Sequence, residues 1–266
     1  MAQKKKIKLK SSKTIVLAID VGNTNLHWAF IKNGKLTGKY NRIKHNQIHS
    51  LPWQRIESNN TPVVAMGALR HIQSKIKSIS KTYKINFISL NASKQNIIKN
   101  TYKTLGIDRI CNLIGGLHSF SSLKSPLVVI DFGSATTISA CDKYGNFLGG
   151  ILRAGIETEF NAISSKPLSL PHVEIKHLKQ IKKLNPFSKT SYDAILNGVL
   201  IGQIGYINYF LNLFQKQHKN LKAVLTGGNA PLIAKLYKDY DLYDPSLTLK
   251  GIYYWYRLIH TSCKHN

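Results

Sequence analysis

The chain has 266 residues, 43% of them hydrophobic, so it can bury a sizeable core in one large or two small domains, and wholesale disorder is excluded. It carries 38 lysine and arginine residues against 12 aspartate and glutamate residues, which gives a formal net charge of +26. No apolar run approaches the roughly 18 residues of a membrane helix, and the basic residues 1–13 lack the apolar segment of a secretory signal.

After a basic tail at residues 1–13, a first α/β domain is predicted at residues 14–123. Apolar runs and the Asn33-Gly34 turn signal predict strands at 14–20, 26–32 and 35–41. The pattern then predicts a strand at 63–66, a helix at 70–81, a strand at 85–90 and a helix at 108–121.

A second α/β domain is predicted at residues 124–266, after the break near Pro126. It begins with a buried strand at 127–131, a hairpin at 136–152 and a helix at 155–164. A loop with lysines and prolines follows at 165–186. The remainder predicts a long helix at 190–217, a strand at 223–226 and helices at 229–237 and 246–260.

The three cysteines, Cys111, Cys141 and Cys263, lie far apart and form no Cys-x-x-Cys pair. Neither a disulfide framework nor a cysteine zinc site is therefore expected, and we expect a globular cytoplasmic protein. The net charge favours polyanions. However, the lysines are spread along the chain without a recognisable nucleic-acid motif, so nucleic acid is not expected as a partner.

Two short segments repeat one scheme of strand, Asp, apolar residue, Gly, small polar residue and Thr. They are Asp20-Val21-Gly22-Asn23-Thr24 and Asp131-Phe132-Gly133-Ser134-Ala135-Thr136, and each leads into a hairpin. Such a repeat indicates a duplicated α/β domain. Acidic residues are scarce in this chain, so the placement of Asp20, Asp108 and Asp131 beside glycines is informative.

The chemistry of these loops favours phosphate binding. Backbone N–H groups at Gly22 and Gly133 can approach phosphate oxygens closely, and the neighbouring hydroxyl and amide side chains add donors. An aspartate at the strand end can hold Mg²⁺. Gly227-Gly228, between a strand and a helix, suits a nucleoside or phosphate. A single Asp-x-Gly is most often an ordinary turn, but no GxxxxGK[ST] or GxGxxG motif competes with the matched pair.

Six segments together resemble the type III pantothenate kinase family, within the superfamily of acetate kinase, sugar kinases and actin. They are DVGNTN at 20–25, LGIDR at 105–109, DFGSATT at 131–137, LGGILRAGI at 148–156, LTGGNAPLI at 225–233 and DPSLTLKGI at 244–252. They occur in the family's order across nearly the whole chain. The departures are Ser134 in place of the usual threonine, Arg153-Ala154 in place of a proline-containing step, and a missing proline ahead of Gly106.

The resemblance implies two duplicated ribonuclease-H-like domains with a nucleotide cleft between them. It also implies transfer of the γ-phosphoryl group of ATP to pantothenate, the first step of coenzyme A synthesis. The cofactors implied are Mg²⁺ and a monovalent cation, K⁺ or NH₄⁺. The implied assembly is a homodimer.

The resemblance further implies a role for each matching residue. Asp108 would be the general base. ATP would be bound by Asp20, Gly22, Asn23, Thr24, Gly133, Ser134, Thr136, Gly227 and Gly228. Substrate would be bound by Tyr102, Gly106, Arg109 and Thr190. Asp20 would hold Mg²⁺, and Asp131 the monovalent cation.

Several alternatives remain open from the sequence. Asp108 and Thr190 could each be a helix cap rather than a site residue. The chain could be a catalytically silent relative that acts in regulation or binds nucleic acid. It could also be a kinase of the same superfamily with another small hydroxylated substrate.

Overall fold

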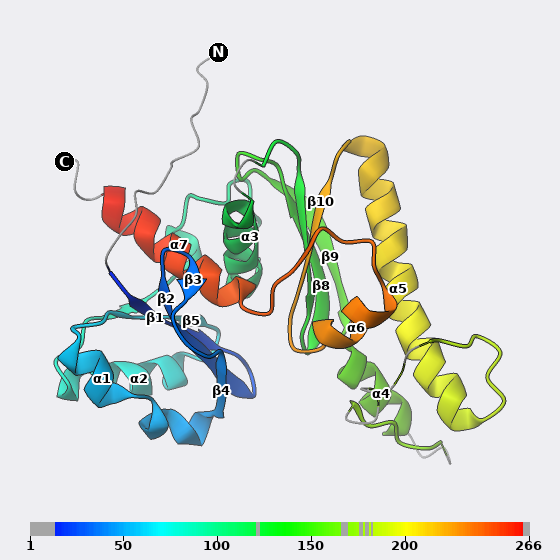
Figure 1. Cartoon of the computed structure of the whole chain (residues 1–266), viewed down its shortest axis with the longest axis horizontal. Helices are drawn as coiled ribbons and strands as arrows, with labels where there is room; N and C mark the ends of the chain where they lie inside the picture. The colour runs from blue at the N-terminus through cyan, green and yellow to red at the C-terminus, as the bar shows by residue number, and fades with distance from the viewer. Residues whose placement is uncertain are drawn as a thin grey trace. The chain divides into compact units, whose positions relative to one another are not determined.

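The computed structural model describes residues 14–120, 123–165, 170–175, 178, 181 and 183–262. These residues form two compact units (Figure 1). The first holds residues 14–120, 144–147 and 246–262, and the second holds 123–143 and 148–245. The predicted tail at 1–13 and parts of the predicted loop at 165–186 lie outside the described residues.

The sheet of the first unit is built around a buried central strand, β1 (Val16–Val21). Its order is β3-β2-β1-β5-β6, with β4 paired to β2. β1 is antiparallel to β2 and parallel to β5, which is in turn parallel to β6. The other strands are β2 (Asn25–Lys32), β3 (Lys35–Leu36), β4 (Asn41–Lys44), β5 (Val63–Gly67) and β6 (Phe87–Ser89).

Helices complete the first unit. Leu17, Ile19 and Val21 of β1 share an apolar core with buried residues of α1 and α2. α3 packs against α7, and α7 also contacts β1, β2 and β5. The helical segments are η1 (His45–Ser50), α1 (Trp53–Ser58), α2 (Arg70–Thr82), η2 (Ala92–Lys94), α3 (Ile107–Ser119) and α7 (Leu247–Ser262).

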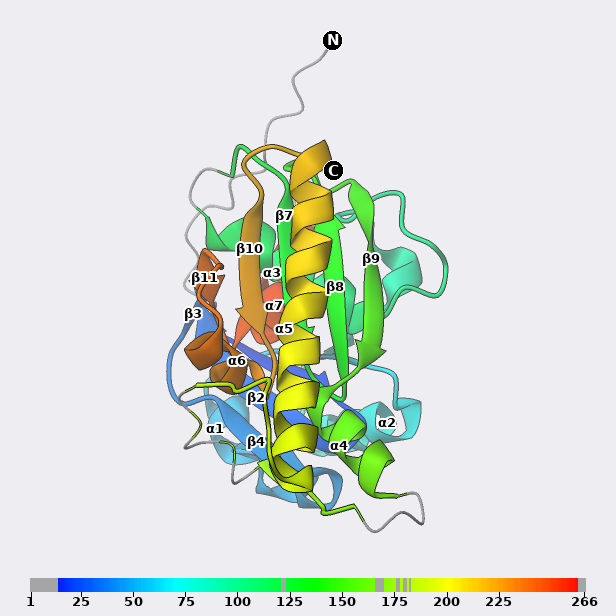
Figure 2. The same cartoon turned by 90° about the vertical axis from the view of Figure 1, so that its right-hand side faces the viewer.

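The second unit has a sheet in the order β11-β10-β7-β8-β9. Figure 2 shows the long helix α5 running along one face of this sheet, where Leu200 and Ile207 are fully buried in the apolar core. The elements are β7 (Leu127–Phe132), β8 (Ala135–Cys141), β9 (Phe147–Ala154), α4 (Ile156–Ser164), α5 (Ser191–Gln217), β10 (Lys222–Thr226), α6 (Ala230–Leu236) and β11 (Leu242–Tyr243).

The two sheets repeat one arrangement, as the duplicated loops predict. In each sheet, the central strand ends in the repeated sequence Asp, apolar residue, Gly. This strand is antiparallel to the next strand of the chain and parallel to a later one. These three strands are β1, β2 and β5 in the first unit and β7, β8 and β10 in the second. The predicted α/β class with two related sheets is confirmed.

The C-terminal helix requires a correction to the predicted domain limits. The sequence assigned it to a second domain at 124–266, but α7 packs with the first unit. Tyr253 and Trp255 are buried there, and the Tyr253 hydroxyl accepts a hydrogen bond of 2.9 Å from the Asn33 backbone N–H. The turn of residues 144–147 also belongs to the first unit, because Lys99 exchanges backbone hydrogen bonds with Gly145 and Phe147.

Most predicted helices and strands are present with ends shifted by a few residues. The predicted return strand at 35–41 is instead two strands, β3 and β4, separated by residues 37–40. The Asn33-Gly34 turn has positive φ at both residues, as its sequence predicts. η1, α1 and β11 were not predicted, since such short elements carry little periodicity.

α5 is long and apolar enough to meet the length and composition criteria for a membrane span, with a mean hydropathy of 1.3. Its contacts are those of a core helix. Asn197 of α5 accepts a hydrogen bond from the Asn185 backbone N–H, and the amide nitrogen of Gln203 donates to the Ala154 carbonyl. α5 therefore forms part of the second unit's core.

The two buried cysteines predict how stability depends on pH. Burial raises the pKa of both the Cys111 and Cys141 thiols. An unfolded thiol ionises near pH 8.5, whereas the folded thiol stays protonated, so the contribution of these thiols to the free energy of unfolding is constant below about pH 8 and falls at higher pH. We expect the free energy of unfolding to drop between pH 8 and pH 10. This drop should be shallower in a Cys111→Ala/Cys141→Ala variant. If the free energy of unfolding fell equally steeply with pH in wild type and variant, the prediction would be wrong.

Candidate active site

The first predicted phosphate loop is an exposed turn held from one side. Asp20 lies near the end of β1, and Asn23 and Thr24 are exposed at the turn into β2. The Gly22 carbonyl lies 2.9 Å from Nε2 of His45, which fixes the turn to η1. The loop thus presents its predicted phosphate donors to solvent.

The second predicted phosphate loop has the same form. Asp131 precedes the last residue of β7, Ser134 is exposed, and the Gly133 N–H donates to the Ala135 carbonyl at 3.2 Å. Thr136 differs from its predicted role as a phosphate contact. It is fully buried, paired with Phe132 on the core face, and its hydroxyl has no hydrogen-bond partner among the described residues.

Thr137 is a candidate that the sequence reasoning missed. It is paired with Asp131 across the hairpin, so the two side chains share a face, and it is only partly buried. Thr137 could have been found in the sequence, because successive side chains of a strand point to opposite faces of the sheet. Counting back across the turn from Asp131 selects Thr137 rather than Thr136 as the residue on the aspartate's face.

Asp108 lies in the first turn of α3, where the helix dipole favours a carboxylate. The N-cap is Gly106 rather than Asp108, so the cap interpretation of Asp108 is wrong. A Cβ at Gly106 would collide with Oδ1 of Asp108, so the carboxylate lies directly against the glycine. Gly106 therefore leaves the space that this carboxylate occupies.

Asp20 and Asp108 lie on different elements of the first unit, β1 and α3, and both act on one buried side chain. Burial first, and then the negative charges of both aspartates, raise the pKa of Cys111. Both carboxylates are therefore within electrostatic reach of this buried thiol on α3.

The predicted substrate residues Arg109 and Tyr102 also meet. Nη1 of Arg109 donates to the Tyr102 hydroxyl at 2.8 Å. Arg109 is buried, whereas Tyr102 is 48% exposed and packs edge-on against Phe147. Arg109 is thus not an ordinary surface residue, and it holds the hydroxyl of an exposed aromatic side chain in the segment that leads into α3.

The Gly227-Gly228 loop, between β10 and α6, packs against the end of β7. Gly227 follows β10 with φ of +98°, and a Cβ there would collide with Oδ1 of Asp131 and lie 2.5 Å from the Phe132 nitrogen. The Asn229 N–H donates to the Phe132 carbonyl at 3.0 Å. Gly228 is exposed with open space beside it. Only glycine fits at 227, and the loop leaves room for a ligand at 228.

Thr190 is the N-cap of α5. Its Oγ1 accepts from the Asp193 backbone at 3.1 Å and donates to the Asp193 carboxylate at 2.7 Å. The capping role that the sequence left open is therefore confirmed. The side chain is exposed, and its substrate role stays a prediction.

A comparison with known proteins identifies the family. Residues 16–212 match the family model described as type III pantothenate kinase. The chain belongs to the type III pantothenate kinase family. It is 28% identical to the type III pantothenate kinase of Persephonella marina over 90% of this chain and 97% of the relative. It is also 28% identical to that of Agathobacter rectalis over 91% and 97% of the two chains.

A solved structure supports the fold of this pantothenate kinase family member. It is a crystal structure from Campylobacter jejuni described as a Baf family transcriptional activator. The TM-score is 0.56 and the identity 22%, over 94% of this chain and all of the other. At this identity the likeness concerns the fold alone.

The residues present fit the divalent ion that a pantothenate kinase of this family uses with ATP. Among the residues that the structure describes, no three His, Cys, Asp or Glu side chains form a metal cluster. Mg²⁺ does not need one, because it keeps several waters and binds through one or two carboxylates and substrate phosphates. Asp20, near the end of β1 beside the exposed loop, is the carboxylate that would supply an oxygen donor to such an ion.

A counterpart of Gly227 in the first unit was missed by the sequence reasoning. Gly67 ends β5 with φ of +141°, and a Cβ there would collide with the Val21 carbonyl. Its own carbonyl accepts a 2.8 Å hydrogen bond from Gln73. The signal was a glycine at the end of the parallel strand in both halves of the chain.

Proposed function

We propose that the protein transfers the γ-phosphoryl group of ATP to the terminal hydroxyl of pantothenate. The observation that carries the proposal is membership of the type III pantothenate kinase family, together with the placement of two of the chain's few acids, Asp20 and Asp108, beside glycine loops. Phosphoryl transfer needs positioning and charge neutralisation more than covalent chemistry. Two carboxylates near exposed phosphate loops can supply both functions.

In this proposal Asp108 accepts the proton of the attacking hydroxyl. Its location in the first turn of α3 stabilises the carboxylate, the form that acts as a base. Asp20 binds Mg²⁺, which neutralises phosphate charge when present. The phosphates are held by Gly22, Asn23, Thr24, Gly133 and Ser134, and the nucleotide by Gly227 and Gly228.

Pantothenate is proposed to bind beside the start of α3, through Gly106, Arg109 and Tyr102. The hydrogen bond from Arg109 to Tyr102 supports this assignment, because it fixes a hydroxyl near the base. Thr190 is also proposed to contact pantothenate. Its hydroxyl would then have to exchange its hydrogen bond to the Asp193 carboxylate for one to the substrate. Thr136 would reach phosphate only if its strand end opened, and Thr137 is the better placed hydroxyl.

Asp131 is proposed to bind K⁺ or NH₄⁺. A Cβ at Gly133 would lie 3.5 Å from the Ala135 carbonyl oxygen and 3.7 Å from Oδ1 of Asp131, so carbonyl and carboxylate oxygens are close to one another there. Oxygen ligands of this kind suit a hard monovalent cation.

A homodimer is proposed on the basis of apolar side chains that remain exposed in the second unit. They lie on β9 and α5 and comprise Leu148, Ile151, Leu152, Ile201, Tyr209 and Leu213. Where exposed apolar side chains form one patch, they mark an interaction site. Light scattering on the purified protein tests the stoichiometry.

We place the protein in the cytoplasm, where free buried thiols such as Cys111 and Cys141 persist.

The regulatory and nucleic-acid alternatives are less well supported. A silent relative does not need to keep its scarce acids, yet Asp20, Asp108 and Asp131 all lie at the candidate loops. The fold likeness to a protein described as a transcriptional activator adds no functional argument.

The proposed function is tested by ADP release with Mg·ATP and pantothenate, in K⁺ buffer and in Na⁺ buffer. We expect turnover that needs both pantothenate and K⁺. Turnover with a sugar or acetate, but not with pantothenate, would point to another substrate of the same superfamily. Folded protein that binds ATP and turns over none of these would contradict the kinase proposal.

A substitution at Gly106 tests the position of the base. Gly106→Ala places a Cβ where Oδ1 of Asp108 lies, so the carboxylate must rotate away. The backbone φ of −56° suits alanine, so the fold should persist. We expect kcat to fall by up to about 100-fold through misplacement of the base, with the melting temperature nearly unchanged. An unchanged kcat would separate Asp108 from the reaction.

A further inference from the structure

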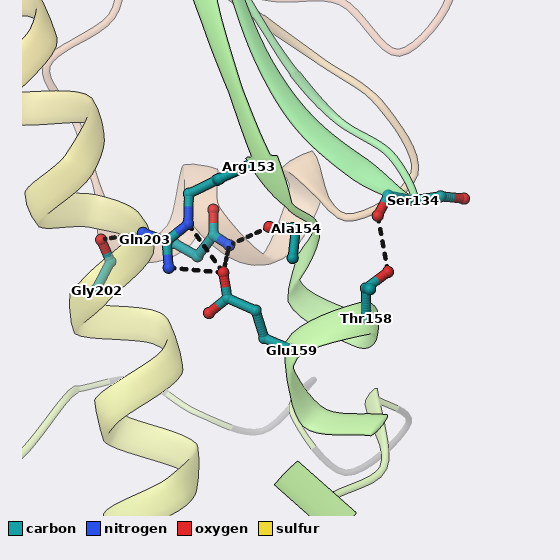
Figure 3. A network of polar contacts seen from close by, with 7 residues as sticks. All are labelled: Ser134, Arg153, Ala154, Thr158, Glu159, Gly202 and Gln203. Carbon is teal, nitrogen blue, oxygen red and sulfur yellow. Dashed lines mark hydrogen bonds and ion pairs between the residues drawn. The ribbon is translucent and has the colours of Figure 1, made fainter. Parts of the chain in front are cut away.

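Three polar side chains from separate segments of the second unit meet at one carboxylate oxygen (Figure 3). Oε1 of Glu159, on α4, accepts from Nε of Arg153 at 2.9 Å and forms an ion pair with its Nη2 at 2.6 Å. The same oxygen accepts from Nε2 of Gln203, on α5, at 2.9 Å. The end of β9, the first turn of α4 and the middle of α5 are thereby joined.

The same side chains also bind backbone carbonyls. Nη1 of Arg153 donates to the Gly202 carbonyl at 3.1 Å, and Gln203 donates to the Ala154 carbonyl at 3.0 Å. Two hydrogen bonds therefore join the end of β9, which precedes α4, to the middle of α5, which follows it. This arrangement fixes where α4 begins.

The start of α4 is in turn bound to the second phosphate loop. The Ser134 carbonyl accepts from Oγ1 of Thr158 at 2.8 Å (Figure 3). It also accepts from the Gly155 N–H at 3.0 Å. A Cβ at Gly155 would lie 2.6 Å from the Ser134 carbonyl oxygen. With so little space between them, the loop at Ser134 must follow any movement of α4.

The network is partly shielded from water. Gln203 is fully buried, the Glu159 side chain is 16% exposed and the Arg153 side chain is 30% exposed. Charge-assisted hydrogen bonds are strong in such surroundings, and removing one partner leaves a buried charge without compensation. The network therefore holds α4 more firmly than an exposed ion pair would.

We propose that Arg153, Glu159 and Gln203 are positioning residues for the phosphate loop, because they lock α4 and α4 carries the two hydrogen bonds that hold Ser134. None of the three needs to touch ATP. This inference rests on the proposed function, in which Ser134 contacts phosphate. Loosening the network should weaken ATP binding and leave the pantothenate residues of the first unit unaffected.

The test compares Glu159→Gln with wild type in full steady-state kinetics and in calorimetric titration with ATP. We expect KM and Kd for ATP to rise by about tenfold or more, while KM for pantothenate stays within twofold. Arg153→Lys keeps the charge, so it should fall between wild type and Glu159→Gln. Unchanged ATP affinity in folded Glu159→Gln would overturn the proposal.

Two further variants keep the test decisive. Thr158→Val removes only the exposed hydroxyl bond to Ser134, so it should fold and raise the Kd for ATP more modestly, even if Glu159→Gln does not fold. Asp241→Asn is the control. It breaks the ion pair with Lys222 at the start of β10, the end away from the Gly227-Gly228 loop, and should leave ATP affinity unchanged. An equal ATP defect in the control would reduce the network to a structural role.

The titration also separates this inference from the proposed function. If wild type binds ATP without turning over pantothenate, the proposed reaction fails, and the effect of Glu159→Gln on ATP binding still decides the positioning role.

Discussion

Asp108→Asn is expected to lower kcat by about 10² to 10⁴-fold, the usual contribution of a general base. Asparagine keeps the shape of the side chain but cannot take the proton of the attacking hydroxyl. ATP affinity should be nearly unchanged, because the proposed phosphate contacts lie in other loops. Asp108 makes no side-chain cap bond at α3, so its loss should cost only the helix-dipole term of about 1 kcal/mol or less.

Glu57→Gln is the matched control for this prediction. Glu57 is an exposed acid on α1 of the same unit, so the substitution removes one negative charge away from the candidate site. The control should retain wild-type kcat. If Asp108→Asn also kept turnover within a few-fold of wild type, the assignment of the base would be wrong.

Gly251→Ala is expected to destabilise the first unit strongly, although alanine normally favours a helix. A Cβ at Gly251 of α7 would collide with the Cys111 carbonyl of α3, and one at Gly115 would lie 2.5 Å from the Leu247 carbonyl. The two helix backbones touch through these glycines. Overpacking of this kind costs about 1–3 kcal/mol or more, and each kcal/mol lowers Tm by about 2–4 °C in chains of this size class.

Gly198→Ala on α5 supplies the opposite expectation. Gly198 is exposed in a helix interior with no atom within 4 Å of an added Cβ. Alanine there should raise stability by about 0.5–1 kcal/mol. Thermal unfolding of both variants should therefore move Tm in opposite directions, and a rise in Tm for Gly251→Ala would disprove the close helix contact. Because α3 carries Asp108, Gly251→Ala should also lower kcat.

Much of the fold was predictable because the informative features are local. An apolar run that ends in aspartate and glycine marks a buried strand and its turn, and its repetition at Asp131 indicated the duplication. The partner of α7 was not predictable in this way. Helical periodicity shows that one face is buried, but it does not show which sheet covers it, and the short sequence distance to the second unit was misleading.

The candidate site was predicted to a similar extent. Asp20, Asp108 and Asp131 were selected from the sequence, and the structure places each near a glycine loop. The approach of both Asp20 and Asp108 to Cys111 depends on how α3 packs, which no local pattern encodes. The contact of Glu159 with Gln203 likewise joins residues distant in sequence, and the sequence reasoning missed both as site residues.

The return of α7 to the first unit affects how the chain folds during synthesis. The helix leaves the ribosome after the second unit, yet it packs on β1, β2 and β5, which leave before that unit. The second unit is complete in sequence by Pro245. The nascent first unit must therefore wait with one face of its sheet uncovered while the second unit folds, which reverses the common N-terminal-first order and makes that face a target for chaperones.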